Sequence, residues 1–356
     1  MMNLKKTLVV LLILFLTCGC TKEIRNYEKY DIQFFDAFDT VTSMIIYEES
    51  EEKANEILSK MKDKFFEYHR IFDRYNNYKG INNLKTINDN AGIRPVKVSD
   101  ELFFLIKKTI EYNKDVSDKI CLTIGPVVDY WSKYNELYNS GATEDEVINE
   151  MGLPIPTHEK LDEFRNLIND EDIILNDVDK SVFLKKKGMI LDLGAVAKGY
   201  ATELVCNYAV DELGVKSGIV SAGGNVKIMG KPVDKPAFKV GIQNPNLESS
   251  QLYLSILTLN DTSVVTSGDY QRYFFYNKKR YCHIINAQSL EPADEYKSVT
   301  VISKDSFFCD YMSTTLFLSS YEEGLELCEK FDVDAVWKFK DGTIKATKGA
   351  EKVMGD

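Results

Sequence analysis

The residues best suited to bind a metal ion lie close together in "CDYMSTT", at positions 309–315. On a helix, steps of three and four residues place Asp310, Ser313 and Thr314 on one face. One carboxylate and two hydroxyls form an oxygen-only ligand set, which suits Mg²⁺ and leaves other positions for backbone carbonyls, water or a ligand phosphate. Such a set by itself is usually an ordinary polar helix face. The neighbouring motifs therefore decide whether it indicates a metal site.

A second candidate segment is "DLGAVAKGYATE", at positions 192–203, which has the pattern of a strand that runs into a helix. Small and apolar residues recur at spacings of three and four from Ala197 to Ala209, as in an amphipathic helix packed on a sheet. The N–H groups that begin a helix attract an anion, and Lys198 adds a full positive charge there. Taken alone, the segment fits a tight turn with a solvated lysine better than an anion site.

Three shorter motifs lie between these two segments. They are "SAGGN" at 221–225, "VTSGDYQRYF" at 265–274 and "HIIN" at 283–286. The paired glycines of the first predict a hairpin turn, and the Ser-Gly pair of the second predicts a loop. His283 alone would be a hydrogen-bonded strand histidine, although an imidazole near its usual pKa also suits a general base.

The first half of the chain is predicted to supply mainly helices to this arrangement. Apolar residues at four-residue steps predict a helix over 51–75, and Ser99 is the expected cap of a second helix. A polar insertion at 132–160 contains Thr143 and Glu146 at the spacing of a capping box, which predicts a surface helix.

The second half of the chain is rich in short β-type runs. From 181 onward these include "GMILDL", "SGIVSAGG", "FKVGIQN", "LYLSILTL", "SVVTSG", "RYCHIIN" and "YKSVTVIS", with two helical stretches among them. Together with a strand predicted at "TVTSMIIY", the pattern predicts an α+β fold without internal repeats.

Composition limits the kind of ligand that the chain binds. Of its 356 residues 44% are hydrophobic, and 20 Tyr and 19 Phe supply a core and the lining of a pocket for a flat ring. A net charge of -11 repels nucleic acid. A phosphate-rich ligand would therefore require cations or a metal concentrated at one site.

The N-terminal segment predicts export and a lipid anchor. Lys5 and Lys6 precede an apolar stretch from Leu8 to Leu16, which is too short to span a bilayer. The following "LTCGC" resembles a bacterial lipobox, so residues 1–19 are the expected signal peptide, Cys20 the acylated residue and 20–33 a tether. An ordinary secretory signal is the alternative. We therefore expect the protein at the outer face of the cytoplasmic membrane.

The seven cysteines have no spacing typical of a thiolate metal site. In an exported chain such a scattered set predicts buried free thiols rather than a disulfide scaffold, with a single bridge left open.

The ordered motifs resemble the ApbE family of FAD:protein FMN transferases. "DLGAVAKGYA", "SAGGN", "HIIN" and "CDYMST" are similar to that family's nucleotide, glycine-turn, histidine and metal motifs. "FDAFDTVTSM", "IFDRYNN" and "LTIGPVVDYW" resemble its earlier elements. The resemblance extends from about 34 to 350 and implies one T-fold-like α+β catalytic unit with a β-rich C-terminal half.

The resemblance also implies an activity and a set of roles. The enzyme would bind FAD with Mg²⁺, transfer FMN to a Thr or Ser hydroxyl of an exported flavoprotein, and release AMP. His283 would be the general base. The metal would be held by Asp310, Ser313, Thr314 and the carbonyl of Ala195. FAD would be contacted by Asp192, Lys198, Ile285, Tyr75, Phe38, Lys119, Ile120 and Cys121.

The chain departs from the family pattern at three places. Ile120-Cys121 stands where the family has Phe-Asp, so a carboxylate is missing there. Phe38-Asp39-Thr40 replaces Met-Gly-Thr, and the Pro and Gly that follow the histidine motif are Ala287 and Leu290.

Two other functions are compatible with parts of the sequence. An FAD pyrophosphatase would use the same metal and phosphate contacts but would give FMN to water. A non-enzymatic solute-binding lipoprotein would instead require two doubly wound lobes, which the β-rich second half does not predict.

Overall fold

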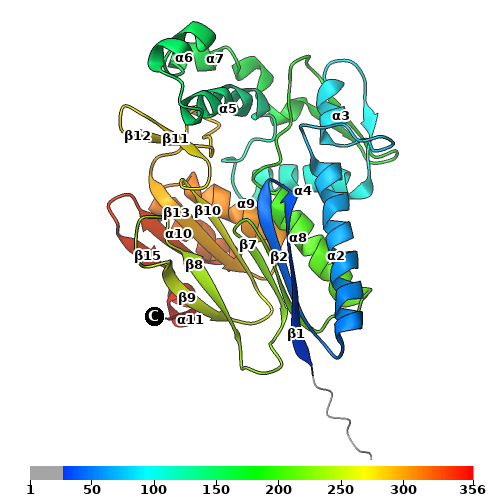
Figure 1. Cartoon of the computed structure of the whole chain (residues 1–356). Helices are drawn as coiled ribbons and strands as arrows, with labels where there is room; N and C mark the ends of the chain where they lie inside the picture. Colours follow the sequence, from blue (N-terminus) through cyan, green and yellow to red (C-terminus); the bar gives the residue numbers. More distant parts are fainter. Residues whose placement is uncertain (1–26, 356) are drawn as a thin grey trace, which may run out of the picture.

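An eight-stranded antiparallel sheet of order β1-β2-β6-β7-β10-β13-β14-β15 forms the centre of the structure (Figure 1). The structure is a computed structural model that describes residues 27–355. The strands of this sheet are β1 (Glu28–Ala37), β2 (Thr40–Glu48), β6 (Ser217–Ala222), β7 (Asn225–Gly230), β10 (Ser263–Gly268), β13 (Tyr296–Ser303), β14 (Asp334–Phe339) and β15 (Ile344–Ala346).

Helices cover one face of the sheet and bury the main hydrophobic core against it (Figure 1). They are α2 (Glu51–Phe72), α4 (Asp100–Asp115), α8 (Ala197–Asp211), α9 (Ser306–Phe317) and α10 (Tyr321–Phe331). The predicted first helix is confirmed as α2, which buries Ile57, Met61 and Phe65 on one stripe. Ser99 caps α4 as predicted, because its side chain accepts a hydrogen bond from the backbone N–H of Leu102.

The other face of the sheet packs on a smaller layer through a second apolar cluster. This layer contains β8 (Phe238–Gln243), β9 (Tyr253–Leu259), α11 (Lys348–Val353) and β16 (Met354–Gly355). Three layers result, and the predicted α+β class is confirmed. The described residues share this one large sheet rather than two doubly wound lobes, which argues against the solute-binding alternative.

A third cluster, rich in aromatic side chains, lies beyond one end of the large sheet, at the top of Figure 1. It is built from α5 (Gly125–Asn139), α6 (Glu144–Met151), α7 (His158–Asp162), β11 (Tyr273–Tyr276) and β12 (Lys279–Cys282). The rings of Tyr138 and Phe274 stack with centroids 5.3 Å apart, which fixes the β11–β12 hairpin on α5.

The remaining elements lie between α2 and α5 or just before α8. They are α3 (Leu84–Asp89), β3 (Val96–Lys97), β4 (Ile173–Asn176), β5 (Ser181–Leu184) and two short 3₁₀ turns at Arg165–Leu167 and Asp170–Asp172. The three strands form a small sheet of order β3-β5-β4.

Two hairpin turns use backbone conformations that favour glycine. Gly223 and Gly224, with φ of 55° and 93°, form the predicted turn between β6 and β7. Phe38 and Asp39 form the β1–β2 turn with φ of 54° and 51°, which is the two-residue geometry of a type I′ turn. Asp39 therefore occupies a left-handed position where the family pattern has glycine.

Leu290, the second position that departs from a family glycine, also has a left-handed backbone, with φ of 62°. Its side chain is fully buried in the aromatic cluster, and its carbonyl accepts a hydrogen bond of 2.8 Å from Trp131 Nε1. Burial of the leucine offsets part of the backbone strain.

Five expectations about secondary structure require correction. The run "GMILDL" at 188–193 is not a strand, because loops and side chains rather than a neighbouring strand satisfy its backbone: Leu191 N donates to Asn88 Oδ1, and Asp192 N donates to Leu122 O. Four helices, rather than two, follow position 181. His283 lies just after β12 instead of within a strand.

The fourth and fifth corrections concern two longer segments, the insertion at 132–160 and the tether at 20–33. The insertion at 132–160 is polar only in part, because α5 extends through Asn139 and buries Tyr134; the capping box of α6 is confirmed. The strand β1 begins at Glu28, so the expected tether at 20–33 contains strand from there on.

The predicted signal peptide at 1–19 and Cys20 lie outside the described residues. Among residues 27–355, every helix is too short or too polar to cross a bilayer.

Candidate functional site

The two segments singled out for chemistry meet where α8 crosses α9. Gly199 N, in the first turn of α8, donates a hydrogen bond of 2.7 Å to Asp310 Oδ2 on α9. Asn225 Nδ2, at the start of β7, lies 3.5 Å from Asp310 Oδ1. A β-carbon at Gly199 would lie 2.4 Å from both Asp310 Cβ and Ser306 O, so only glycine permits this contact.

Asp310 is a buried carboxylate whose hydrogen-bond donors are uncharged. It is 3% exposed, and burial raises its pKa above the ordinary value, while the charge of Lys198 acts in the opposite direction. The neighbouring Asn225 Oδ1 is buried and has no hydrogen-bond partner. An unpartnered oxygen beside a carboxylate that is costly to keep charged fits a bound hard cation.

Hydroxyl groups extend this oxygen cluster along α9. Ser313 Oγ donates to the Asp310 carbonyl at 3.0 Å and lies 2.8 Å from Ser267 Oγ. Thr314 Oγ1 is 3.3 Å from the same Ser267 oxygen. No group of three or more His, Cys, Asp or Glu side chains that could hold a metal occurs within residues 27–355, so any cation here would depend on these hydroxyls.

Replacing Gly199 by alanine is expected to lower the free energy of unfolding by about 1–3 kcal/mol, because the added methyl group forces α8 and α9 apart. The separation should also remove the Gly199–Asp310 hydrogen bond and reduce activity. Chemical denaturation measures the first effect. Gly355→Ala is the matched control, since its β-carbon would make only an ordinary 3.4 Å contact; equal stability of the two variants would contradict the prediction.

Asp192 and Lys198 lie on the turn that leads into α8. Asp192 Oδ1 accepts a hydrogen bond of 2.7 Å from Gly194 N, and Lys198 Nζ lies 3.4 Å from the Gly194 carbonyl. The cap residue Val196 offers no side-chain acceptor to the first N–H groups of α8. The charge of Lys198 opposes the rise that burial causes in the pKa of Asp310, and it adds to the lowering that desolvation causes in the pKa of His283. Ala195 is on the same turn.

His283 is held by the residue that precedes β11. Its backbone N–H donates to the Arg272 carbonyl at 3.1 Å, and its ring Nδ1 is 3.2 Å from the same oxygen. A carbonyl only accepts, so Nδ1 carries the proton and Nε2 presents a lone pair. Part of the His283 side chain is exposed to solvent. Protein groups near the ring desolvate it, and this desolvation, together with the charges of Arg272 and Lys198, lowers the pKa of His283 to about 4.

Three further predicted FAD contacts lie in different surroundings. Tyr75 is 57% exposed, and its ring centre lies 5.1 Å from the guanidinium carbon of Arg74. The Phe38 ring instead packs inward against Phe65, at 5.2 Å. Ile285 is 9% exposed and belongs to the aromatic cluster near α5.

The segment from Lys119 to Cys121 is tied to the rest of the molecule by acidic residues. Lys119 Nζ lies 3.4 Å from Glu323 Oε1, and Ile120 is buried. Cys121 Sγ is 3.3 Å from Asp170 Oδ1. Position 121 therefore has no carboxylate of its own but lies beside the carboxylate of Asp170. Asp170 also accepts hydrogen bonds from the N–H groups of Leu122 and Thr123.

Arg74 and Asp129 were not among the predicted site residues, yet both contact Asp192 or its partner. The Arg74 guanidinium donates to Asp192 Oδ2 with one terminal nitrogen and to Asp129 Oδ1 with the other. The motifs "IFDRYNN" and "LTIGPVVDYW" contain these two residues, but they assigned no role to either.

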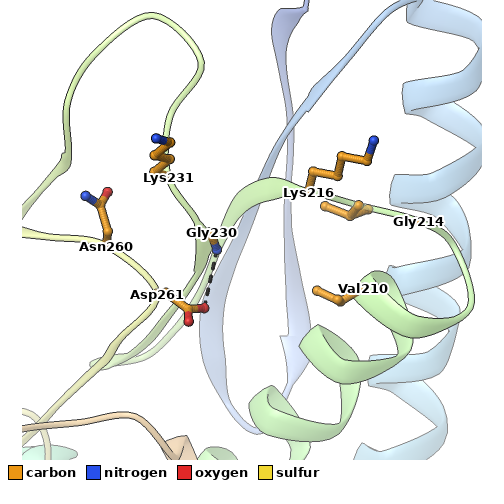
Figure 2. A pocket seen from close by; sticks show the side chains of 8 residues that line it. Val210, Gly214, Lys216, Gly230, Lys231, Asn260 and Asp261 are labelled. Carbon is orange, nitrogen blue, oxygen red and sulfur yellow. Dashed lines mark hydrogen bonds between the residues drawn. The ribbon is translucent and has the colours of Figure 1, made fainter.

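A separate open cavity of about 620 Å³ lies at the C-terminal end of α8, the opposite end from Lys198 (Figure 2). Figure 2 shows it between Lys231 and Asn260 on one side and Val210 and Lys216 on the other. It contains none of the candidate residues and no buried polar side chain that could orient a ligand. The convergence of charged and hydroxyl groups therefore locates the site better than the size of a cavity does.

The chain belongs to the ApbE family, whose family model matches residues 38–337. It is 33% identical over 281 residues to an FAD:protein FMN transferase of Klebsiella pneumoniae, which covers 77% of this chain and 82% of that protein. A Treponema pallidum protein of the same name is 26% identical over 349 residues, covering 94% and 90% of the two chains.

Solved structures agree with the fold. The ApbE protein of Thermotoga maritima superposes with a TM-score of 0.75 at 23% identity, covering 92% of this chain and all of that one. The flavin transferase ApbE of Vibrio cholerae gives 0.73 at 19% identity, with coverage of 92% and 100%. The family resemblance is thus confirmed, and this protein is an enzyme, a transferase.

Proposed function

We propose that this transferase moves the FMN part of FAD onto a Ser or Thr hydroxyl of an exported flavoprotein, with Mg²⁺ bound, and releases AMP. The observation that carries the proposal is the contact between Asp310 and the start of α8, the helix turn that also carries Lys198. The names of the relatives support the same reaction.

The diphosphate of FAD would lie at the first turn of α8. There, N–H groups without a side-chain cap and the Lys198 ammonium would attract its negative charge. Asp310, Ser313, Thr314 and the Ala195 carbonyl would hold the Mg²⁺ ion. When bound, the ion would neutralise and orient the diphosphate.

His283 would act on the hydroxyl that attacks. Its Nε2 accepts the hydroxyl proton while the oxygen forms a bond to the FMN-side phosphorus. The bond from that phosphorus to the bridging oxygen breaks, and AMP leaves with the electron pair. Because Nδ1 donates to the Arg272 carbonyl, the basic Nε2 lies on the other side of the ring from that contact.

The lowered pKa of His283 predicts the acid side of the pH profile. A histidine with a pKa of about 4 remains neutral, and so able to accept a proton, at all pH values well above 4. We therefore expect kcat/KM for FAD to stay level as the pH falls from about 8 to about 5, and to decrease only near 4. Steady-state assays with an acceptor measure this profile; a decrease centred near 6.5, the ordinary value for histidine, would contradict it.

One experiment tests the proposal directly. The protein is incubated with FAD, Mg²⁺ and candidate exported flavoproteins, and intact-mass spectrometry detects added FMN. Labelled acceptor and free AMP are expected. Free FMN and AMP without labelled protein would instead favour the pyrophosphatase.

We also propose that the chain is anchored by lipid on Cys20, at the outer face of the cytoplasmic membrane. The apolar segment that ends in "LTCGC" supports this. Metabolic labelling with palmitate should label the intact chain and should not label the Cys20→Ser variant.

A further inference from the structure

The strongest unexplained feature of the site is the buried guanidinium of Arg74. Its side chain is 7% exposed, and it joins two carboxylates that lie 118 and 55 residues further along the chain. Asp192 belongs to the turn before α8, and Asp129 belongs to α5. Arg74 therefore links three separate segments at one point.

A contribution to stability alone does not explain this arrangement of Arg74 and the two carboxylates. Arg74 Nε is buried without a hydrogen-bond partner, so part of the desolvation cost of the guanidinium is not recovered. Two carboxylates around one cation also leave a net negative charge in a partly buried place. Buried charges of this kind are often replaced by apolar residues without loss of stability, which indicates a purpose other than packing.

The carboxylate of Asp192 is fixed from several directions. Arg74 holds Oδ2, Gly194 N holds Oδ1 at 2.7 Å, and the backbone of Asp192 donates to Leu122 O at 2.8 Å. The charge of Asp192 also opposes the lowering that desolvation causes in the pKa of His283.

Asp129 differs from Asp192 because its side chain is 42% exposed. Only one contact, that from Arg74, occupies Asp129 Oδ1, and a carboxylate has about four lone-pair positions. Asp129 is therefore open to a ligand donor on the side away from Arg74.

We propose that Arg74 is a positioning residue that holds Asp192 against bound FAD, and that Asp129 is a further binding residue, which accepts a hydrogen bond from an N–H of the nucleotide. Both ring systems of FAD carry such donors. The inference rests on the proposed function, since it assumes that FAD is the ligand.

The test measures FAD affinity by quenching of flavin fluorescence, and folding by thermal denaturation. The variants are Arg74→Gln, Arg74→Lys, Asp129→Ala and the double variant Arg74→Gln/Asp129→Ala. The double variant loses one positive and one negative charge, so the net charge of the cluster stays that of the natural protein. Asp63→Asn, an exposed change on α2, is the control.

The expected results separate positioning from charge balance. Asp129→Ala should weaken FAD binding about tenfold, and Arg74→Gln and Arg74→Lys about 10- to 100-fold, because hydrogen bonds to charged groups are lost and the compact ammonium of lysine does not reproduce the planar donor fork that arginine presents to the two carboxylates. The double variant should regain the thermal stability of the natural protein but not its FAD affinity.

Recovery of FAD affinity in the double variant would overturn the role of Arg74, since it would then only neutralise charge. Unchanged affinity in Asp129→Ala would overturn the role of Asp129. If Arg74→Gln does not fold, Arg74→Lys and Asp129→Ala decide the question. Failure of the natural protein itself to bind FAD would overturn the proposed function, and this inference with it, before any variant is compared.

Discussion

Replacing Asp310 by asparagine is expected to lower FMN transfer by about 10³-fold or more, because the only carboxylate of the predicted metal site is lost. Asparagine keeps an oxygen that can accept from Gly199 N, so the contact between α8 and α9 survives and the protein should stay folded. Transfer of FMN to an acceptor, followed by mass spectrometry, measures the loss.

Metal removal provides the matching measurement for Asp310. EDTA should reduce the natural enzyme to the level of the variant, and added Mg²⁺ should restore only the natural enzyme. Mg²⁺ should also raise the thermal midpoint of the natural protein and leave that of Asp310→Asn unchanged. Transfer by the variant that still depends on the metal would show that the cation is held elsewhere. Asp63→Asn again controls for loss of a charge.

Replacing His283 is the second change with a large expected effect. His283→Ala should lower kcat by about 10²- to 10⁴-fold, the usual contribution of a general base, and change the dissociation constant of FAD much less. His283→Asn tests the reason for the loss. Its amide can donate to the Arg272 carbonyl as the ring Nδ1 does, but it offers no basic nitrogen.

The two histidine variants should therefore be equally slow. Activity retained by His283→Asn would mean that the ring only holds the chain near Arg272. Parallel losses of FAD affinity and kcat would make His283 a binding residue. His158→Ala is the matched control, since that side chain is 74% exposed and none of the proposed roles falls on it.

Local patterns predicted much of the fold. The stripe of α2, the caps at Ser99 and Thr143 and the Gly223-Gly224 turn all depend on residues a few positions apart, and all were confirmed. The run "GMILDL" failed because an apolar segment looks like a strand whether its backbone pairs with another strand or with loops. Only the tertiary structure decides that choice.

The family resemblance implied that the Asp310 segment and the start of α8 share one metal site. The Gly199–Asp310 hydrogen bond joins these two segments, while the metal and the residue roles stay predictions. The roles proposed for Arg74 and Asp129 could not be predicted in this way. Both residues lie in quoted motifs, but their ion pair spans 55 residues, and only the tertiary structure shows it.

The five described cysteines are all free, as predicted, and burial raises the pKa of each thiol, to about 12 for Cys121 and Cys328 and about 11 for Cys282. Thiols with such pKa values stay protonated near neutral pH and react slowly with alkylating dyes. A cysteine introduced at Phe275, which is 53% exposed on the hairpin leading to His283, would be the fast-reacting thiol of residues 27–355. A fluorophore attached there would report the arrival of an acceptor in real time, with no native cysteine removed from the described part of the chain.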